Sequence, residues 1–151
     1  MKNKILVLLL FFLASCGYQP IYLNKDLEKK EFSKIFLEGD DDINKKILKT
    51  LPISENEQKI QQDQLHIVSS YNIEHALKSS SGQITSYKTI ISLNLEIKDY
   101  NNKSIINRNF TKQSIYNNKE NSFELANYQA TIKDNLTKAI INEIIIFLSL
   151  Q

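Results

Sequence analysis

Three long stretches of alternating apolar and polar residues constrain the fold of this chain most strongly. The clearest covers 87–98, where every second residue from Tyr87 to Ile97 belongs to the apolar stripe. Such a period of two places the stripe on one face of a β-strand. A second stripe covers 65–74, and a weaker one covers 104–116, as expected near a sheet edge. Polar turns at 79–82 and 99–102 join the stretches, so the sequence predicts an antiparallel meander of three long strands.

Shorter patterns add one more strand and two helices. Residues 32–37 alternate as a short strand, and the Gly-Asp-Asp-Asp run at 39–42 ends it. Apolar residues at helical spacing predict one helix over 41–51, capped by an Asp and stopped by Pro52. A longer helical stripe covers 122–148. The predicted order is β-α-β-β-β-α, an α+β fold with a four-stranded, mostly antiparallel sheet and two helices packed on one of its faces.

The N-terminus has the three parts of an export signal. Lys2 and Lys4 precede an unbroken apolar run from Ile5 to Ala14, and small residues follow. These features are typical of a cleaved secretory signal peptide, here 1–15. The alternatives are a short buried helix or a signal anchor, but the apolar run is shorter than the roughly 20 residues that span a bilayer.

Cys16 is the only cysteine, and an exported protein with one cysteine needs an explanation for it. The sequence Leu-Ala-Ser-Cys at 13–16 resembles the bacterial lipoprotein box. This resemblance implies that the chain is cleaved before Cys16 and that acyl chains are attached covalently to Cys16. By resemblance to Gram-negative sorting signals, Gly17 in place of an Asp implies the outer membrane, facing the periplasm. The expected organisation is therefore a signal peptide at 1–15, a lipidated tether at 16–31 and one domain at 32–151.

Charge and motifs exclude several function classes. Loss of Lys2 and Lys4 with the signal peptide lowers the 19 basic residues to 17, equal to the 17 acidic ones, so we expect no nucleic-acid partner. His66 and His75 lack the spacing of a metal site, and we expect both to be exposed. The acidic run at 40–42 is interpreted as a helix start and not as a cation site. No nucleophile turn or phosphate-binding glycine loop is present, so we expect no enzyme activity and no cofactor.

The segment that begins at Cys16 points to a family. Cys-Gly-Tyr-Gln-Pro-Ile-Tyr at 16–22 resembles the start of mature lipopolysaccharide-assembly lipoproteins of the LptE family, as found in alphaproteobacteria. Chain length, element order and the long last helix agree with that family by pattern. The resemblance implies a non-enzymatic outer-membrane lipoprotein, partly inside an LptD-type β-barrel. It would plug that barrel, assist its assembly and help deliver lipopolysaccharide to the outer leaflet.

A water-lined barrel lumen requires a plug with polar surfaces, which the solvent faces of the strands would supply. Basic residues expected on those faces are candidates to contact lipid phosphates or lumen carboxylates: Lys88, Lys98, Arg108 and Lys112. The simpler interpretation is that they are ordinary solvated residues. The apolar end of the last helix, 139–150, is either core, which we favour, or a docking surface.

Two other function classes compete with the plug. The first is a periplasmic auxiliary lipoprotein of an ABC-type transport complex or of an outer-membrane barrel-assembly complex. It would also be anchored and α+β, and only its partner separates it from the plug. The second is a lipid-anchored hydrolase, for which the chain offers no motif.

Overall fold

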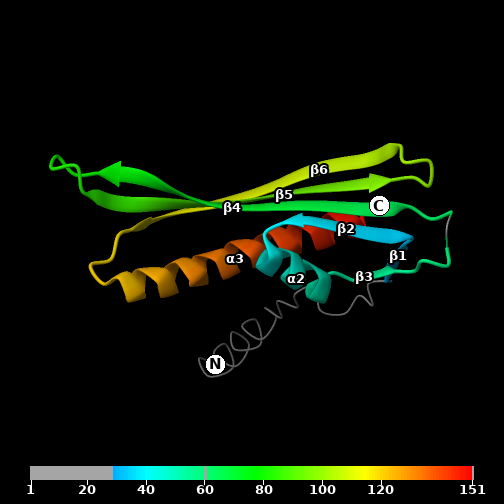
Figure 1. Cartoon of the computed structure of the whole chain (residues 1–151), viewed down its shortest axis with the longest axis horizontal. Helices are drawn as coiled ribbons and strands as arrows, with labels where there is room; N and C mark the ends of the chain where they lie inside the picture. Colours follow the sequence, from blue (N-terminus) through cyan, green and yellow to red (C-terminus); the bar gives the residue numbers. More distant parts are fainter. Residues whose placement is uncertain (1–28, 60, 151) are drawn as a thin grey trace, which may run out of the picture.

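A computed structural model describes residues 29–59 and 61–150 of the chain. In chain order the elements of these residues are β1 (Lys30–Phe32), β2 (Lys34–Gly39), α2 (Asp41–Thr50), β3 (Ile53–Glu55), β4 (Gln64–Lys78), β5 (Ile84–Lys98), β6 (Ser104–Asn117) and α3 (Ser122–Ser149). The three long strands lie side by side along the molecule, and α3 runs beneath them (Figure 1).

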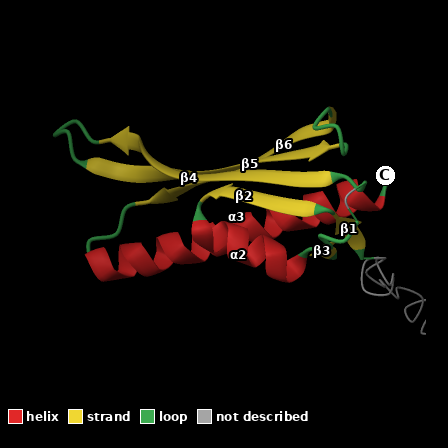
Figure 2. Ribbon diagram, turned by 45° about the vertical axis from the view of Figure 1, so that its right-hand side comes forward, coloured by secondary structure: helices red, strands yellow, loops and turns green. Residues whose placement is uncertain are grey.

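The main sheet has four strands in the order β2-β4-β5-β6. The β4–β5 and β5–β6 pairs are antiparallel, which confirms the predicted meander. Strand β2 pairs with β4 in parallel, because α2 and β3 carry the chain back across the sheet before β4 begins. Both helices lie on the same face of this sheet (Figure 2). The predicted α+β fold is therefore confirmed.

The core fills the space between that face and the helices. The inward-facing residues are buried from Leu65 to Ser69 in β4 and from Thr89 to Ile97 in β5, as the period-2 stripes predicted, whereas Tyr71, Ile73 and Tyr87 are half-buried. Helix α2 contributes Ile43 and Ile47, and α3 contributes Ile140, Ile141 and Ile144. The sheet contributes these buried residues: Leu65, Ile67, Ile91, Leu93, Leu95, Ile97 and Phe110.

A second, two-stranded sheet was not predicted. Strands β1 and β3 pair in parallel from Lys30–Ile53 to Phe32–Glu55. The single strand expected at 32–37 is therefore split at Ser33, whose hydroxyl donates to the Gln62 carbonyl (2.9 Å). Residues 30 and 31, which were expected in the tether, belong to β1. Strands of three residues are too short to show a period in sequence.

The link between β2 and α2 passes very close to β4. Gly39 has a φ of 96°, and a Cβ built on it would lie 1.8 Å from the Ser69 carbonyl oxygen. Asp40 follows as the cap of α2, and its Oδ1 accepts from the Ile43 N–H (3.0 Å). The Ser69 hydroxyl accepts from the Asp40 N–H (3.0 Å) and donates to Asn44 Oδ1 (2.8 Å). The expected capping role of the acidic run is thus confirmed for Asp40.

Candidate interaction surfaces

The face of the sheet that points away from the helices carries an uncharged central area. Three rows of residues, aligned across β4, β5 and β6, make up this area. We call it the uncharged band, and its members are Val68, Asn94 and Asn109 in the first row, Ser70, Ser92 and Thr111 in the second, and Asn72, Ile90 and Gln113 in the third. Since an antiparallel sheet with helices on one face leaves the other to solvent, this polarity was expected.

Hydrogen bonds between neighbouring strands order the uncharged band. The Asn94 amide donates to Oδ1 of both Asn107 and Asn109 (2.8 Å each). The Ser92 and Thr111 hydroxyls are 3.1 Å apart. Cross-strand side-chain pairs of this kind hold neighbouring strands in register.

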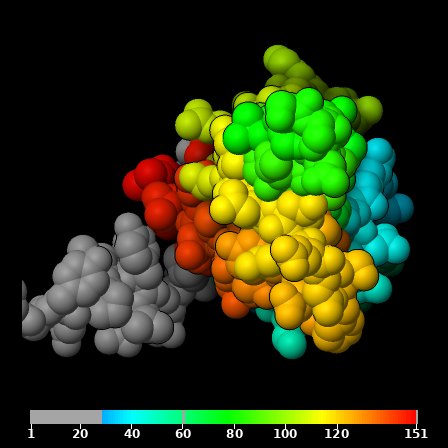
Figure 3. Space-filling model, turned by 90° about the vertical axis from the view of Figure 1, so that its left-hand side faces the viewer, coloured from blue at the N-terminus to red at the C-terminus, as the bar shows by residue number. Residues whose placement is uncertain are grey.

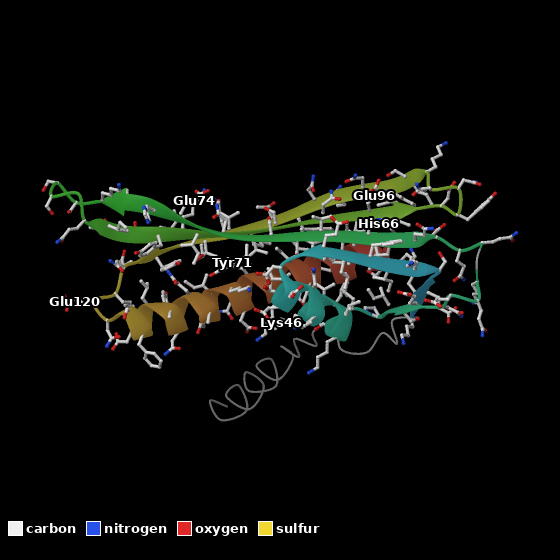
Figure 4. The ribbon with its side chains drawn as sticks, viewed as in Figure 1. Lys46, His66, Tyr71, Glu74, Glu96 and Glu120 are labelled. Atoms are coloured by element: carbon white, nitrogen blue, oxygen red, sulfur yellow. The ribbon has the colours of Figure 1, made fainter. Side chains whose placement is uncertain are left out.

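Charged residues border the band at both ends along the strands. Glu74 and Lys88 are cross-strand partners at one end, whereas Glu96 and Lys98 lie at the other, with their charged groups 3.5 Å apart. In Figure 4 the labelled Glu74 and Glu96 stand on the outer face on either side of the central part of the sheet. Glu38 of β2 lies beside Val68, so the band is a neutral area with charged residues at both ends and along its β2 side.

The four basic candidates do not share one face, which corrects the expectation that all lie on solvent faces. Lys88 and Lys98 are on the outer face, next to the uncharged band. Arg108 and Lys112 align with Leu95 and Ile91 and so face the helices. The Lys112 ammonium pairs with the Glu143 carboxylate of α3, and the Arg108 guanidinium lies over the Phe147 ring, 5.7 Å from its centroid. These two residues hold α3 against the edge strand β6.

The two histidines lie on opposite faces of β4. His75 is exposed, as expected, but His66 is half-buried because its ring stacks on Phe36 of β2 with centroids 4.3 Å apart. Burial, with a contribution from the Lys98 charge, lowers the pKa of His66. Within 29–59 and 61–150 no cluster of three or more metal-binding side chains occurs.

On the helix side, Lys133 of α3 joins α2 to the sheet. Its ammonium lies 2.9 Å from Asp40 Oδ2, 3.4 Å from Asp42 Oδ2 and 4.7 Å from the centroid of the Tyr71 ring. Burial alone would raise the pKa of Asp40, but the hydrogen bonds from Lys133 and Ile43 and the Lys133 charge lower it overall. Burial likewise opposes the charge of Lys133, whose pKa is nevertheless raised by Asp40 and Asp42. Sequence spacing gave no signal for this contact, because 93 residues separate Asp40 from Lys133.

The end of the molecule with the β4–β5 turn exposes large apolar side chains. Figure 3 looks at this end, with the turn in green and the start of α3 in yellow and orange below it. Leu77 is 64% exposed and Phe123 72% exposed. Further in, Tyr116 stacks on Tyr87 and meets Tyr128 edge-on, so aromatic contacts connect β5, β6 and α3.

The apolar end of α3 serves mainly as core, in line with the interpretation that we favoured. Ile140, Ile141 and Ile144 are buried against the sheet, whereas Leu150 is 77% exposed. A shallow cleft of about 350 Å³ lies between this end and β6, with Arg108 and Phe147 in its lining.

Among the described residues, no helix is sufficiently long and apolar to cross a bilayer. The signal peptide at 1–15, Cys16 and nearly all of the tether lie outside the described residues.

Comparison with known proteins places the fold among bacterial lipoproteins. The structure is similar to rare lipoprotein B from Shewanella oneidensis, with a TM-score of 0.57 and 9% identity over 78% of this chain and 96% of that one. It is also similar to an uncharacterized lipoprotein B from Nitrosomonas europaea, with a TM-score of 0.61 and 12% identity over 87% of this chain and 91% of that one. No family model matches the sequence, and no curated protein does. The chain therefore has the lipoprotein B fold, at an identity that shows the fold alone.

Proposed function

We propose that this chain is an outer-membrane lipoprotein of the LptE type, anchored by acyl chains on Cys16 and facing the periplasm. Its body would plug an LptD-type β-barrel, assist the assembly of that barrel and help deliver lipopolysaccharide to the outer leaflet. The observation that carries the proposal is the lipoprotein B fold in a chain whose residues 13–16 resemble a lipoprotein box.

The physical properties of the anchor support permanent attachment. Each buried methylene contributes about 0.8 kcal/mol of membrane binding, and one acyl chain alone binds reversibly. Several chains on the single residue Cys16 would therefore keep the protein on the membrane. The 17 basic and 17 acidic residues of the processed chain give the body no net charge with which to bind anionic lipid instead.

The surface of the body supports the plug. A barrel lumen is polar and water-lined, so a plug must expose hydrogen-bonding groups on several sides and keep its apolar residues inside. The sheet meets this requirement with the uncharged band on its outer face, while its other face and the helices enclose the core. A plug acts by shape and polarity, so the proposal requires no catalytic residue.

The basic residues divide into two roles under this proposal. Lys88 and Lys98 stand on the outer face, where Lys98 also pairs with Glu96, and we propose that both contact lumen carboxylates or lipid phosphates. Arg108 and Lys112 serve mainly to fix α3 to β6, because each already contacts that helix. A role in contacting lipid is therefore proposed for Lys88 and Lys98 first.

Affinity purification from detergent-solubilised membranes tests the proposal. A C-terminally tagged chain should bring down a large outer-membrane β-barrel protein in stable association, identified by mass spectrometry. Recovery of an inner-membrane permease in its place would favour the auxiliary-lipoprotein alternative. Recovery of the tagged chain with no barrel protein would refute the plug.

The anchor needs its own test. Cys16→Ser should abolish labelling with radioactive palmitate and leave the precursor uncut. The wild-type chain is the positive control for labelling, and persistent labelling of Cys16→Ser would show that the lipoprotein box is assigned wrongly.

A further inference from the structure

We propose that the uncharged band is the centre of the interface with the barrel, seated against an uncharged, hydrogen-bonding part of the lumen wall. This inference rests on the proposed function, and it assigns the contact to one face of the body.

The composition of the band differs from that of an ordinary solvated surface. Such surfaces carry about 25–35% charged residues, so nine positions would hold two or three charges. The three rows across β4, β5 and β6 hold none, and the first charge beyond them in β2 is Glu38, beside Val68. The next row at each end is charged again, with Glu96 at one end and Glu74 opposite Lys88 at the other. Protein interfaces have this arrangement, because their centres are depleted of charged residues and their rims are polar.

The hydrogen-bonding groups of the band suit a neutral partner. The Asn94 amide nitrogen is used by Asn107 and Asn109. Among the contacts between described residues, Asn94 Oδ1 and the amide nitrogen of Asn109 have no partner, so they remain available, as does the amide nitrogen of Asn107 beside the band. A neutral amide exchanges water for a protein partner at little cost, whereas a buried charge without a partner is strongly unfavourable. The desolvation of the band on binding therefore costs little free energy.

The outer side of α3 differs from the band. Thr131 is exposed there, and its hydroxyl is already used by the Asn127 carbonyl (3.0 Å). Lys138 crosses the same side, 65% exposed and paired with Asp134 (2.7 Å). A charged, largely exposed pair within the surface is unfavourable at the centre of an interface. The helix side therefore supplies a matched control.

The band is too small to form the whole interface with the barrel. Three neighbouring strands and three alternate rows span about 10 Å by 14 Å. A stable interface uses about 800 Å² on each partner. The surrounding rows, with Lys88 and Lys98, must therefore contribute to the contact, and the band determines where its centre lies.

The experiment compares one charge on the band with the same charge on α3. Asn94→Lys should lower the amount of barrel recovered with the tagged chain at least tenfold, because the new ammonium has no partner in a neutral wall. Thr131→Lys should change the recovery by less than twofold. Circular dichroism melting of both variants verifies that they are folded.

Photo-crosslinking supplies a second measurement that does not depend on added charge. A benzoylphenylalanine residue at Thr111 should crosslink to the barrel, whereas the same residue at Thr131 should not. If Asn94→Lys retains the barrel, or Thr131→Lys loses as much of it as Asn94→Lys, the inference is wrong while the plug stands. If the wild-type chain recovers no barrel, the proposed function fails and the inference fails with it.

Discussion

The tight passage of Gly39 past β4 yields a prediction that separates two physical costs. A Cβ at this position would lie 1.8 Å from the Ser69 carbonyl oxygen, and the φ of 96° is unfavourable for any side chain. Gly82, in the β4–β5 turn, has a similar φ of 82° but no atom within 4 Å of the added Cβ. Gly82→Ala therefore measures the backbone cost alone, and Gly39→Ala adds the collision.

The magnitudes follow from the contacts. A left-handed backbone costs an alanine about 1–2 kcal/mol, which applies to both variants. Relief of the collision moves the end of β2 away from β4. This movement breaks the Asp40 N–H bond to Ser69 (3.0 Å) and strains the Ser69–Asn44 bond (2.8 Å). At about 1 kcal/mol for each bond, Gly39→Ala should lose about 3–4 kcal/mol in total.

Urea unfolding followed by circular dichroism in detergent measures both variants. The expected difference of about 2 kcal/mol between them corresponds to about 4–10 °C in Tm for a domain of this size. The gain from a less flexible unfolded chain is the same for both substitutions and cancels in the difference. Equal losses of stability in Gly39→Ala and Gly82→Ala would refute the claim that β2 contacts β4 this closely.

Three further predictions concern the charged contact, the core and the outer rim. Because the pKa of Asp40 is lowered in the fold, its contribution to stability is present above its unfolded pKa of about 4 and lost as the pH falls through the folded value. Lys133→Met should weaken this acid dependence in urea titrations at pH 2–6, and an unchanged profile would contradict the contact. Ile144→Ala should cost about 2–5 kcal/mol in urea unfolding, because Ile144 is completely buried. Ile146→Ala, at a position 37% exposed, should cost less than half as much, and equal losses would contradict the orientation of α3. Lys88→Gln should leave the melting temperature within about 2 °C of wild type, because Lys88 is only half-buried and lies outside any ion pair among the described residues.

Local periodicity accounts for what the sequence predicted well. The alternation from Tyr87 to Ile97 specifies β5 because this strand lies between β4 and β6 and buries one face from Thr89 to Ile97. The same holds for α2, where Asp40 caps the helix and Ile43 and Ile47 repeat at helical spacing. Patterns within one element are sufficient for such predictions.

Contacts between distant segments account for the errors. His66 is half-buried because β2 pairs with β4 in parallel and brings Phe36 over it, and nothing in either segment alone specifies that pairing. Arg108 and Lys112 lie on the helix face of β6, although we expected the solvent face, and Arg108 is exposed there at the sheet edge. Both lie two residues from the buried Phe110, so the alternation of β6 already contained that signal. At an edge strand, the stem of a long basic side chain lies on the core face while its charged group reaches solvent at the edge of the sheet.

The central claim is that an acylated chain forms a stable complex with a barrel in the outer membrane. Native mass spectrometry of the tagged protein, extracted in mild detergent, tests this claim in one measurement. The account predicts a complex whose lighter component begins at Cys16, carries the mass of its acyl chains and dissociates from a much larger barrel protein. A free chain that begins at Met1, with an unmodified thiol and no partner, would contradict it.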